Sequence, residues 1–160
     1  SPDKLVIEGG SAGGLLIAAC INMNPSLYNA AILRVPFVDC LTTMLDPNAP
    51  LTIGEYNEWG NPEKKTYHDY ILSYSPYDNL DLNKKYPHIY IDSGINDSQV
   101  MIHEPLKYYA KLTQNQHFRD NTKTLLFDIR TDSGHSGSSK RYQGFIDEAR
   151  ILTFILKQTL

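Results

Sequence analysis

The sequence has no long hydrophobic run, few cysteines and no cluster of basic residues. No stretch of about 18 apolar residues occurs, so no membrane-spanning helix is predicted. Lys and Arg are scattered and the formal net charge is -3. This argues against a nucleic-acid surface, because such a surface concentrates positive charge against phosphates. The first residues also lack the apolar core of a signal peptide. We therefore expect neither a membrane nor a nucleic acid as partner.

The cysteine and histidine content is low and unpatterned. Cys20 and Cys40 are the only cysteines, and each lies in apolar sequence. Two buried free thiols favour a reducing compartment over a disulfide framework, so the predicted location is cytoplasmic. The sequon-like tripeptide at residues 96–98 is expected to be unused. The five histidines and two cysteines form no metal-ligand pattern, so no metal and no other cofactor is predicted.

Short apolar runs alternate with helical patterns along the chain. The runs that predict buried strands are residues 5–7, 30–35, 88–92 and 124–129. The residues that predict the apolar faces of two later helices are Leu106, Tyr109, Ala110 and Leu112, and then Tyr142, Phe145, Ala149, Leu152 and Leu156. Alternating strands and helices predict a mostly parallel sheet with helices on both faces. Residues 38–86 interrupt this pattern with a polar excursion over the sheet edge, which includes a short helix near residues 66–73.

A glycine-rich turn joins the first strand to the first helix. Gly9-x-Ser11-x-Gly13 is the pattern of a nucleophile elbow, which presents a serine at a sharp turn. Glycines on both sides of the serine are expected to remove clashes with the adjoining strand and helix. The helix that begins at Ala12 directs unpaired N–H groups at the reacting centre, so the Ala12 N–H is the predicted oxyanion donor. The alternative is a phosphate-binding loop, which would need a glycine at position 11 or a Gly-Lys-Ser/Thr ending.

A serine nucleophile needs a base and an orienting acid. In α/β-hydrolases these residues follow the chain order Ser, acid, His. Asp97 comes after the next-but-one strand, and His135 lies in a loop of small residues after the last strand. The sequence therefore predicts the triad Ser11, Asp97 and His135. Asp132 would serve as the acid only if this order were broken.

The predicted sheet is too small for a complete domain of this class. Four strands are fewer than such a sheet normally needs, and the first strand feeds directly into the glycine cluster. We therefore expect an α/β-hydrolase fold whose first strands are absent. The open sheet edge would favour self-association of the fragment.

Seven segments carry a resemblance to a known family, namely residues 9–16, 35–39, 43–46, 50–52, 58–62, 74–79 and 94–100. They resemble the prolyl oligopeptidase family of serine peptidases, and its oligopeptidase B branch in particular. The resemblance covers essentially the whole chain. It implies that residues 1–160 are the C-terminal part of a catalytic domain, which in the full protein is paired with a β-propeller that admits short peptides. It also implies that a tyrosine hydroxyl from the missing upstream part is a second oxyanion donor.

The resemblance also implies cleavage after Lys or Arg. Family members similar to this chain use acidic residues in the segment that here spans residues 54–59. Glu55 matches the first of them, whereas Asn57 stands where the branch usually has a second glutamate. Glu55 is expected to bind the basic side chain through charge-assisted hydrogen bonds, and Asn57 to weaken its capture. The alternative for Glu55 is a solvated loop charge.

The predicted function is hydrolysis of short peptides by a serine oligopeptidase through an acyl-enzyme mechanism. An esterase or lipase is an alternative, because fold and triad do not choose the acyl substrate. A catalytically silent hydrolase-like binding module is another, although it would have no need of all three triad residues. The isolated fragment is expected to be inactive, because part of the substrate cleft is missing.

Overall fold

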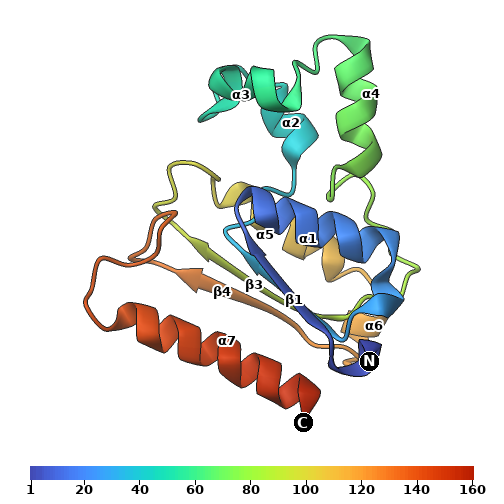
Figure 1. The fold of residues 1–160 in the computed structure, drawn as a ribbon, viewed down its shortest axis with the longest axis vertical. Coiled ribbons are helices and arrows are strands. Elements are labelled where there is room, and N and C mark those ends of the chain that lie inside the picture. The colour runs from blue at the N-terminus through green and yellow to red at the C-terminus, as the bar shows by residue number, and fades with distance from the viewer.

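The computed structural model describes residues 1–160 as a four-stranded parallel sheet covered by helices on both faces (Figure 1). The strands are β1 (Val6–Gly10), β2 (Ala30–Arg34), β3 (His88–Gly94) and β4 (Leu125–Arg130), in the spatial order β1-β2-β3-β4. The long helices are α1 (Ala12–Met23), α5 (His103–Leu112) and α7 (Gln143–Thr159). Short helical segments are η1 (Pro2–Lys4), η2 (Pro25–Leu27) and α6 (Gln116–Arg119). All four predicted strands and the parallel sheet are confirmed.

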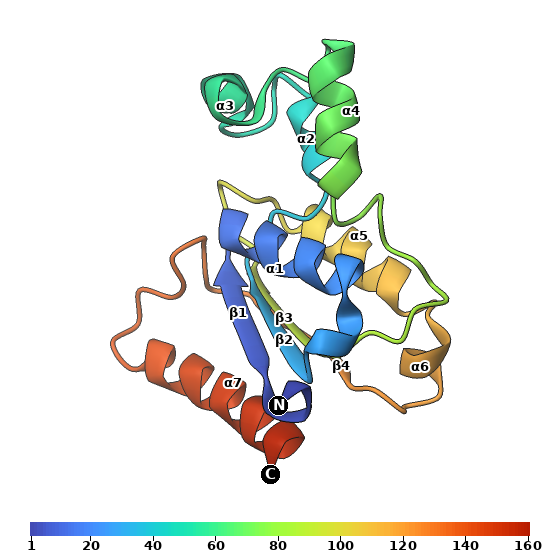
Figure 2. The same ribbon diagram turned by 45° about the vertical axis from the view of Figure 1, so that its right-hand side comes forward.

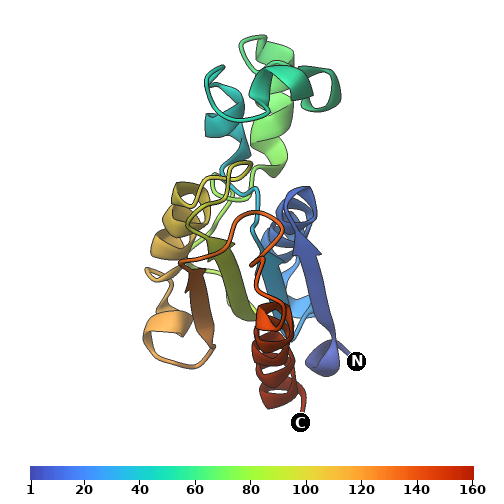
Figure 3. The ribbon, with the colours of Figure 1, turned by 90° about the vertical axis from the view of Figure 1, so that its left-hand side faces the viewer.

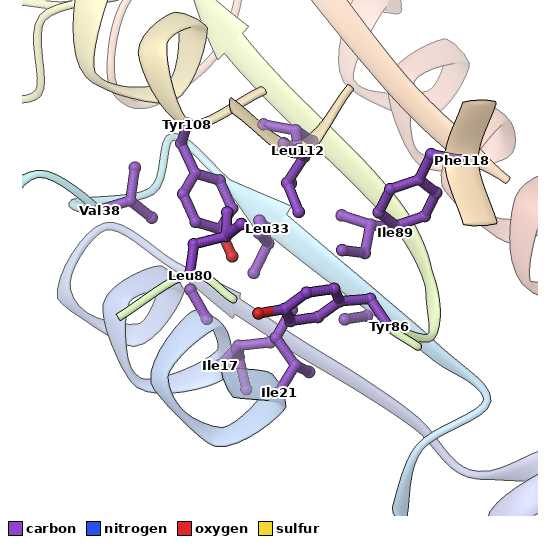
Figure 4. Close-up of a cluster of buried hydrophobic side chains, with 13 residues drawn as sticks. Ile17, Ile21, Leu33, Val38, Leu80, Tyr86, Ile89, Tyr108, Leu112 and Phe118 are labelled. Atoms are coloured by element: carbon purple, nitrogen blue, oxygen red, sulfur yellow. The ribbon is translucent and has the colours of Figure 1, made fainter. Parts of the chain in front are cut away.

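Two hydrophobic clusters lie on opposite faces of the sheet, because successive side chains of a strand point to opposite sides. One cluster joins the sheet to α1, α5 and α6 and includes Ile17, Ile21, Leu33, Ile89, Tyr108, Leu112 and Phe118 (Figure 4). The other joins the sheet to α7 and consists of Ala30, Ile32, Tyr90, Ile151 and Phe154. Figure 3 shows α7 on the opposite side of the sheet from α1 and α5. The two central strands, β2 and β3, are buried on both faces, whereas the edge strands β1 and β4 are only partly buried.

The apolar face predicted for α7 is wrong. Phe145 and Leu152 of the predicted stripe are 75% and 52% exposed. The residues that α7 buries against the sheet are instead Ile151 and Phe154, together with Asp147. Because α7 carries apolar side chains on more than one side, spacing alone did not identify the side that packs on this sheet.

The prediction for α5 is also partly wrong. Tyr108 and Leu112 are fully buried, whereas Leu106 is 45% exposed and Ala110 also faces outward. Two of the four predicted residues, Tyr109 and Leu112, therefore pack against the core, whereas Leu106 and Ala110 do not.

A helical cap, defined here as residues 38–77, lies beyond the carboxyl ends of the strands (Figure 2). It contains α2 (Cys40–Met44), α3 (Thr52–Trp59) and α4 (Lys65–Tyr74), and α4 confirms the short helix predicted near residues 66–73. The cap leaves and rejoins the sheet at one neck, where the Tyr77 N–H donates a 2.9 Å hydrogen bond to the Val38 carbonyl. It is thus a single excursion placed over the end of the sheet that carries Ser11.

Two further predictions concern membranes and thiols. None of the helices combines the length and the apolarity needed to cross a bilayer. Both cysteines are free thiols, with Cys40 buried and Cys20 partly buried.

Candidate active site

Ser11 lies at the tight turn between β1 and α1 and has a strained backbone. Its φ of 55° and ψ of -123° are rarely adopted by a residue with a side chain. Its N–H donates to the Arg34 carbonyl at 2.9 Å, and its own carbonyl accepts from the Phe37 N–H at 3.1 Å. These bonds to β2 and to the following loop hold the turn that presents the serine hydroxyl.

Close approach of the backbone explains two of the glycines around Ser11. A Cβ added to Gly9 would lie 2.4 Å from the Gly13 carbonyl oxygen, and one added to Gly14 would lie 2.6 Å from Cβ of Pro36. By contrast, a Cβ at Gly13 would meet nothing within 4 Å. The predicted need for glycine is therefore confirmed at Gly9 and at Gly14, but not at Gly13.

The backbone of Ala12 supplies a free donor beside the serine. Ala12 is the first residue of α1, so its N–H has no acceptor within the helix. Ala12 also lines the same cavity as Ser11. The positive end of the helix dipole adds to the attraction that this N–H can exert on a negatively charged oxygen.

Asp97 and His135 form a hydrogen-bonded pair. His135 Nδ1 lies 2.8 Å from Asp97 Oδ2. The other oxygen of Asp97 accepts the N–H groups of Gln99 and Val100 at 2.8 and 2.9 Å. Because an ionised carboxylate only accepts hydrogen bonds, Nδ1 of His135 donates to Asp97, and in the neutral imidazole Nε2 is left as an acceptor. The Asp97 side chain is fully buried and that of His135 is 15% exposed, so the pair is held rigidly with the ring edge accessible.

The three predicted triad residues leave the sheet at the same end. Ser11 follows β1, Asp97 follows β3 and His135 follows β4, and all four strands are parallel. The structure brings Asp97 and His135 into contact, whereas the Ser11 hydroxyl forms no hydrogen bond with either.

A cavity of about 90 Å³ opens beside Ser11, between the elbow and the cap. Residues that line it include Ser11, Ala12, Phe37, Glu55, Glu58 and Trp59. The rings of Phe37 and Trp59 meet edge to face, with centroids 5.8 Å apart. The cavity therefore combines an aromatic wall with two carboxylates next to the serine.

The structure separates the two residues predicted to bind substrate. Glu55 lines the cavity and accepts a 2.8 Å hydrogen bond from Trp59 Nε1. Asn57 is exposed and does not line the cavity. The second carboxylate of the lining is Glu58, which the sequence analysis missed. Since residues three and four apart share one face of a helix, the spacing of Glu55, Glu58 and Trp59 was the signal that could have identified it.

The remaining titratable residues suggest no metal centre. No group of three or more histidine, cysteine or acidic side chains is arranged to hold a metal ion.

The parallel sheet, the helices on both faces and the strained serine between strand and helix define an α/β-hydrolase fold. The model of the prolyl oligopeptidase family matches residues 1–160. This chain belongs to the prolyl oligopeptidase family.

Individual relatives agree with this assignment. The chain is 47% identical to dipeptidyl aminopeptidase BI of Pseudoxanthomonas mexicana, over 98% of this chain and 21% of that protein. It is 44% identical to protease 2 of Moraxella lacunata, over 98% of this chain and 22% of that protein.

Solved structures show the same relationship. Oligopeptidase B from Leishmania major matches with a TM-score of 0.92 at 42% identity, over 99% of this chain and 22% of that one. Oligopeptidase B from Trypanosoma brucei with covalently bound antipain matches with a TM-score of 0.90, also at 42% identity, over the same shares of the two chains. The chain thus spans about one fifth of the length of these relatives.

Proposed function

We propose that this chain is the C-terminal part of the catalytic domain of a serine oligopeptidase. The observation that carries the proposal is the 2.8 Å bond between His135 and Asp97 at the end of the sheet where Ser11 occupies its strained turn. In this mechanism His135 Nε2 takes the Ser11 proton during attack on a peptide carbonyl and returns it to the leaving amine. Asp97 keeps the imidazole in the required tautomer and stabilises the imidazolium.

The Ala12 N–H is the oxyanion donor supplied by this chain. It stands at the start of α1, next to the serine that attacks. A single donor of this kind contributes roughly 3–4 kcal/mol of transition-state stabilisation. The second donor, a tyrosine hydroxyl, belongs to the upstream part of the protein.

The proposed substrates are short peptides cleaved after Lys or Arg. Glu55 and Glu58 place two carboxylates in the cavity beside Ser11, and Phe37 and Trp59 line its wall. A guanidinium can pair with carboxylates in a bidentate fashion and lie against an aromatic face. Glu58 supplies the second carboxylate, which Asn57 at the neighbouring position does not provide.

The complete protein adds further hydrolase strands and a β-propeller. β1 is at the edge of the sheet, where more strands can pair. Exposed apolar residues of α7, such as Phe145 and Leu152, offer a surface for the helices that accompany them. The chain covers about one fifth of its relatives, which leaves ample length for both parts. The isolated fragment, with this edge open, is expected to self-associate.

We also propose a reducing compartment, the cytoplasm, for the protein. The two free thiols support this proposal.

Labelling of the full-length protein with a fluorophosphonate tests the nucleophile. The wild type should be labelled, and Ser11→Ala should abolish labelling. Ser26→Ala is the matched control, because Ser26 is exposed and bonds only to Asn24. Persistent labelling of the Ser11→Ala variant would refute the assignment. Comparison of an arginine-amide substrate with a short-chain ester then distinguishes a peptidase from an esterase.

A further inference from the structure

A buried ion network lies at the carboxyl end of the sheet. The two side-chain oxygens of Asp92 in β3 lie 3.1 Å from a terminal nitrogen of Arg130 and 3.6 Å from Nε of Arg34. The other terminal nitrogen of Arg130 lies 3.5 Å from Asp147 of α7. The side chains of Asp92, Asp147 and Arg130 are only 2%, 4% and 8% exposed. The network therefore ties β3, β4 and α7 together away from solvent, and Arg34, whose side chain is 32% exposed, extends it to β2.

The main chain of the same two arginines holds the loops of the proposed triad. The Arg34 carbonyl accepts the Ser11 N–H at 2.9 Å. The Arg130 carbonyl accepts the Ile95 N–H, also at 2.9 Å, two residues before Asp97. The turn that presents Ser11 and the loop that carries Asp97 are therefore hydrogen-bonded to Arg34 and Arg130. The side chains of these two arginines both pair with Asp92.

The loop that carries His135 also starts at this network. Arg130 is the last residue of β4, so residues 131–142 follow directly from it. The Asn96 N–H donates to the Ser133 carbonyl at 3.1 Å, which bonds the acid loop to the base loop. The position of Arg130 thus affects both partners of the 2.8 Å bond between Asp97 and His135.

Electrostatics makes this position well defined. Nε of Arg130 is buried without a hydrogen-bond partner, so the ion pairs at its two terminal nitrogens orient the guanidinium. Burial raises the pKa of Asp92, and the charges of Arg130 and Arg34 act in the opposite sense. Removing Arg130 would leave two buried carboxylates short of a partner, and the strand ends would shift to rehydrate them.

We propose that Arg130, through its pair with Asp92, is a positioning residue that sets the approach of His135 to Ser11. The proposal rests on the proposed function, because it presupposes that these residues form the triad. It assigns to Asp92 and Arg130 a role in the chemical step in addition to packing. Neither residue lines the cavity beside Ser11.

The test measures kcat and KM of full-length Arg130→Met, Arg130→Lys and Asp92→Asn. A displacement of about 1 Å in a catalytic group costs about 10²-fold in rate, so Arg130→Met should lower kcat by about that factor and leave KM within about two-fold. Arg130→Lys should have a kcat between those of Arg130→Met and the wild type. The lysine keeps the positive charge, but its single ammonium group cannot contact Asp92 and Asp147 together as the planar guanidinium does. The double variant Arg130→Met/Asp92→Asn should lose no more than the worse single variant, since the residues act as a unit.

Arg150→Met is the matched control. Arg150 is half-exposed, and it pairs with Asp128 at 3.2 Å and with Asp147 at 3.5 Å. It therefore shares Asp147 with Arg130 but bonds to none of the loops that carry the triad. Its loss should leave kcat within about two-fold. If Arg130→Met fails to fold, as circular dichroism would show, Arg130→Lys decides.

The outcomes separate this inference from the proposed function. Normal kcat in folded Arg130→Lys and Asp92→Asn variants, with labelling abolished by Ser11→Ala, would overturn the positioning role alone. A loss that appears in KM instead of kcat would also overturn it. Labelling that survives in Ser11→Ala would overturn the proposed function itself.

Discussion

The buried carboxylate of Glu104, in the first turn of α5, accepts a 2.6 Å hydrogen bond from Thr43 Oγ1 in α2. Its second oxygen accepts the Asp39 N–H at 3.1 Å. Lys107, one turn further along α5, pairs with the Asp39 side chain. The base of the cap is therefore fastened to the helix that follows the Asp97 loop. The cap carries Glu55 and Glu58, so this junction sets where the cavity lies relative to Asp97.

The same junction predicts a pH-dependent stability. Burial, reinforced by the nearby charge of Asp39, raises the pKa of Glu104 from 4.5 to about 7. Since the folded protein holds this proton more tightly than the unfolded chain, the stabilisation is complete below pH 4.5 and is lost as the pH rises through about 7. The loss is on the order of 3 kcal/mol. We expect full-length Glu104→Gln to melt close to the wild type near pH 5 and at a higher temperature than the wild type near pH 8, because glutamine resembles the protonated carboxyl and does not ionise.

The exposed residue Glu63 provides the control for this prediction. Glu63→Gln should keep the pH dependence of the wild type. A constant difference in melting temperature between Glu104→Gln and the wild type over this range would contradict the role of Glu104.

Substitution of the two glycines tests the elbow. Gly9→Ala would place a Cβ 2.4 Å from a backbone oxygen, so labelling of Ser11 should fall by about 10²-fold or more. Gly13→Ala fills open space and should leave labelling nearly unchanged, while it stabilises the protein by about 0.4–1 kcal/mol. The rate of fluorophosphonate labelling measures the first effect and thermal melting the second. Equal damage by both substitutions would contradict this account of the turn.

Substitution in α3 tests the substrate pocket. Glu55→Gln should lower kcat/KM for an arginine substrate by about 10²-fold, because a charge-assisted pair is lost next to the serine. Glu58→Gln should have a smaller effect, since this side chain is exposed. Asn57→Ala is the matched control, and its kcat/KM should remain that of the wild type. The ratio of kcat/KM for an arginine substrate to that for a norleucine substrate isolates the electrostatic part. A larger effect at Asn57 than at Glu58 would contradict the pocket geometry.

The Asp97–His135 bond predicts a large loss on Asp97→Asn. The asparagine amide would favour the wrong imidazole tautomer, which in serine proteases lowers kcat by about 10⁴-fold. Asp132→Asn is the control, because the exposed Asp132 pairs with Lys140 outside this bond. Steady-state measurements of kcat for both variants show which aspartate orients His135. A greater loss in Asp132→Asn would identify Asp132 as the acid instead.

Local features of the fold could be predicted from the sequence because their causes are local. The β1–α1 turn follows from the glycines around Ser11, and four apolar runs specify four strands, of which β2 and β3 are buried as predicted. The buried side of α7 could not be predicted, because Phe145 and Ile151 are both apolar and only the sheet selects between them. Glu58 was not predicted because the resemblance pointed to position 57. The i, i+3 spacing from Glu55 on a helix points to position 58 instead.

The ion network was missed for a different reason. Asp92 and Arg130 are 38 residues apart in the chain, and nothing in either segment indicates their pairing. A charged residue within an apolar strand indicates a buried partner, but only the register of β3 and β4 identifies it.

The neck of the cap, closed by the bond between Val38 and Tyr77, has a consequence for how specificity can change. The segment that is proposed to recognise the substrate side chain enters and leaves the scaffold at one point, between β2 and β3. We therefore expect that exchange of residues 38–77 as a cassette between family members would transfer the cleavage preference and leave the chemistry at the strand ends unchanged.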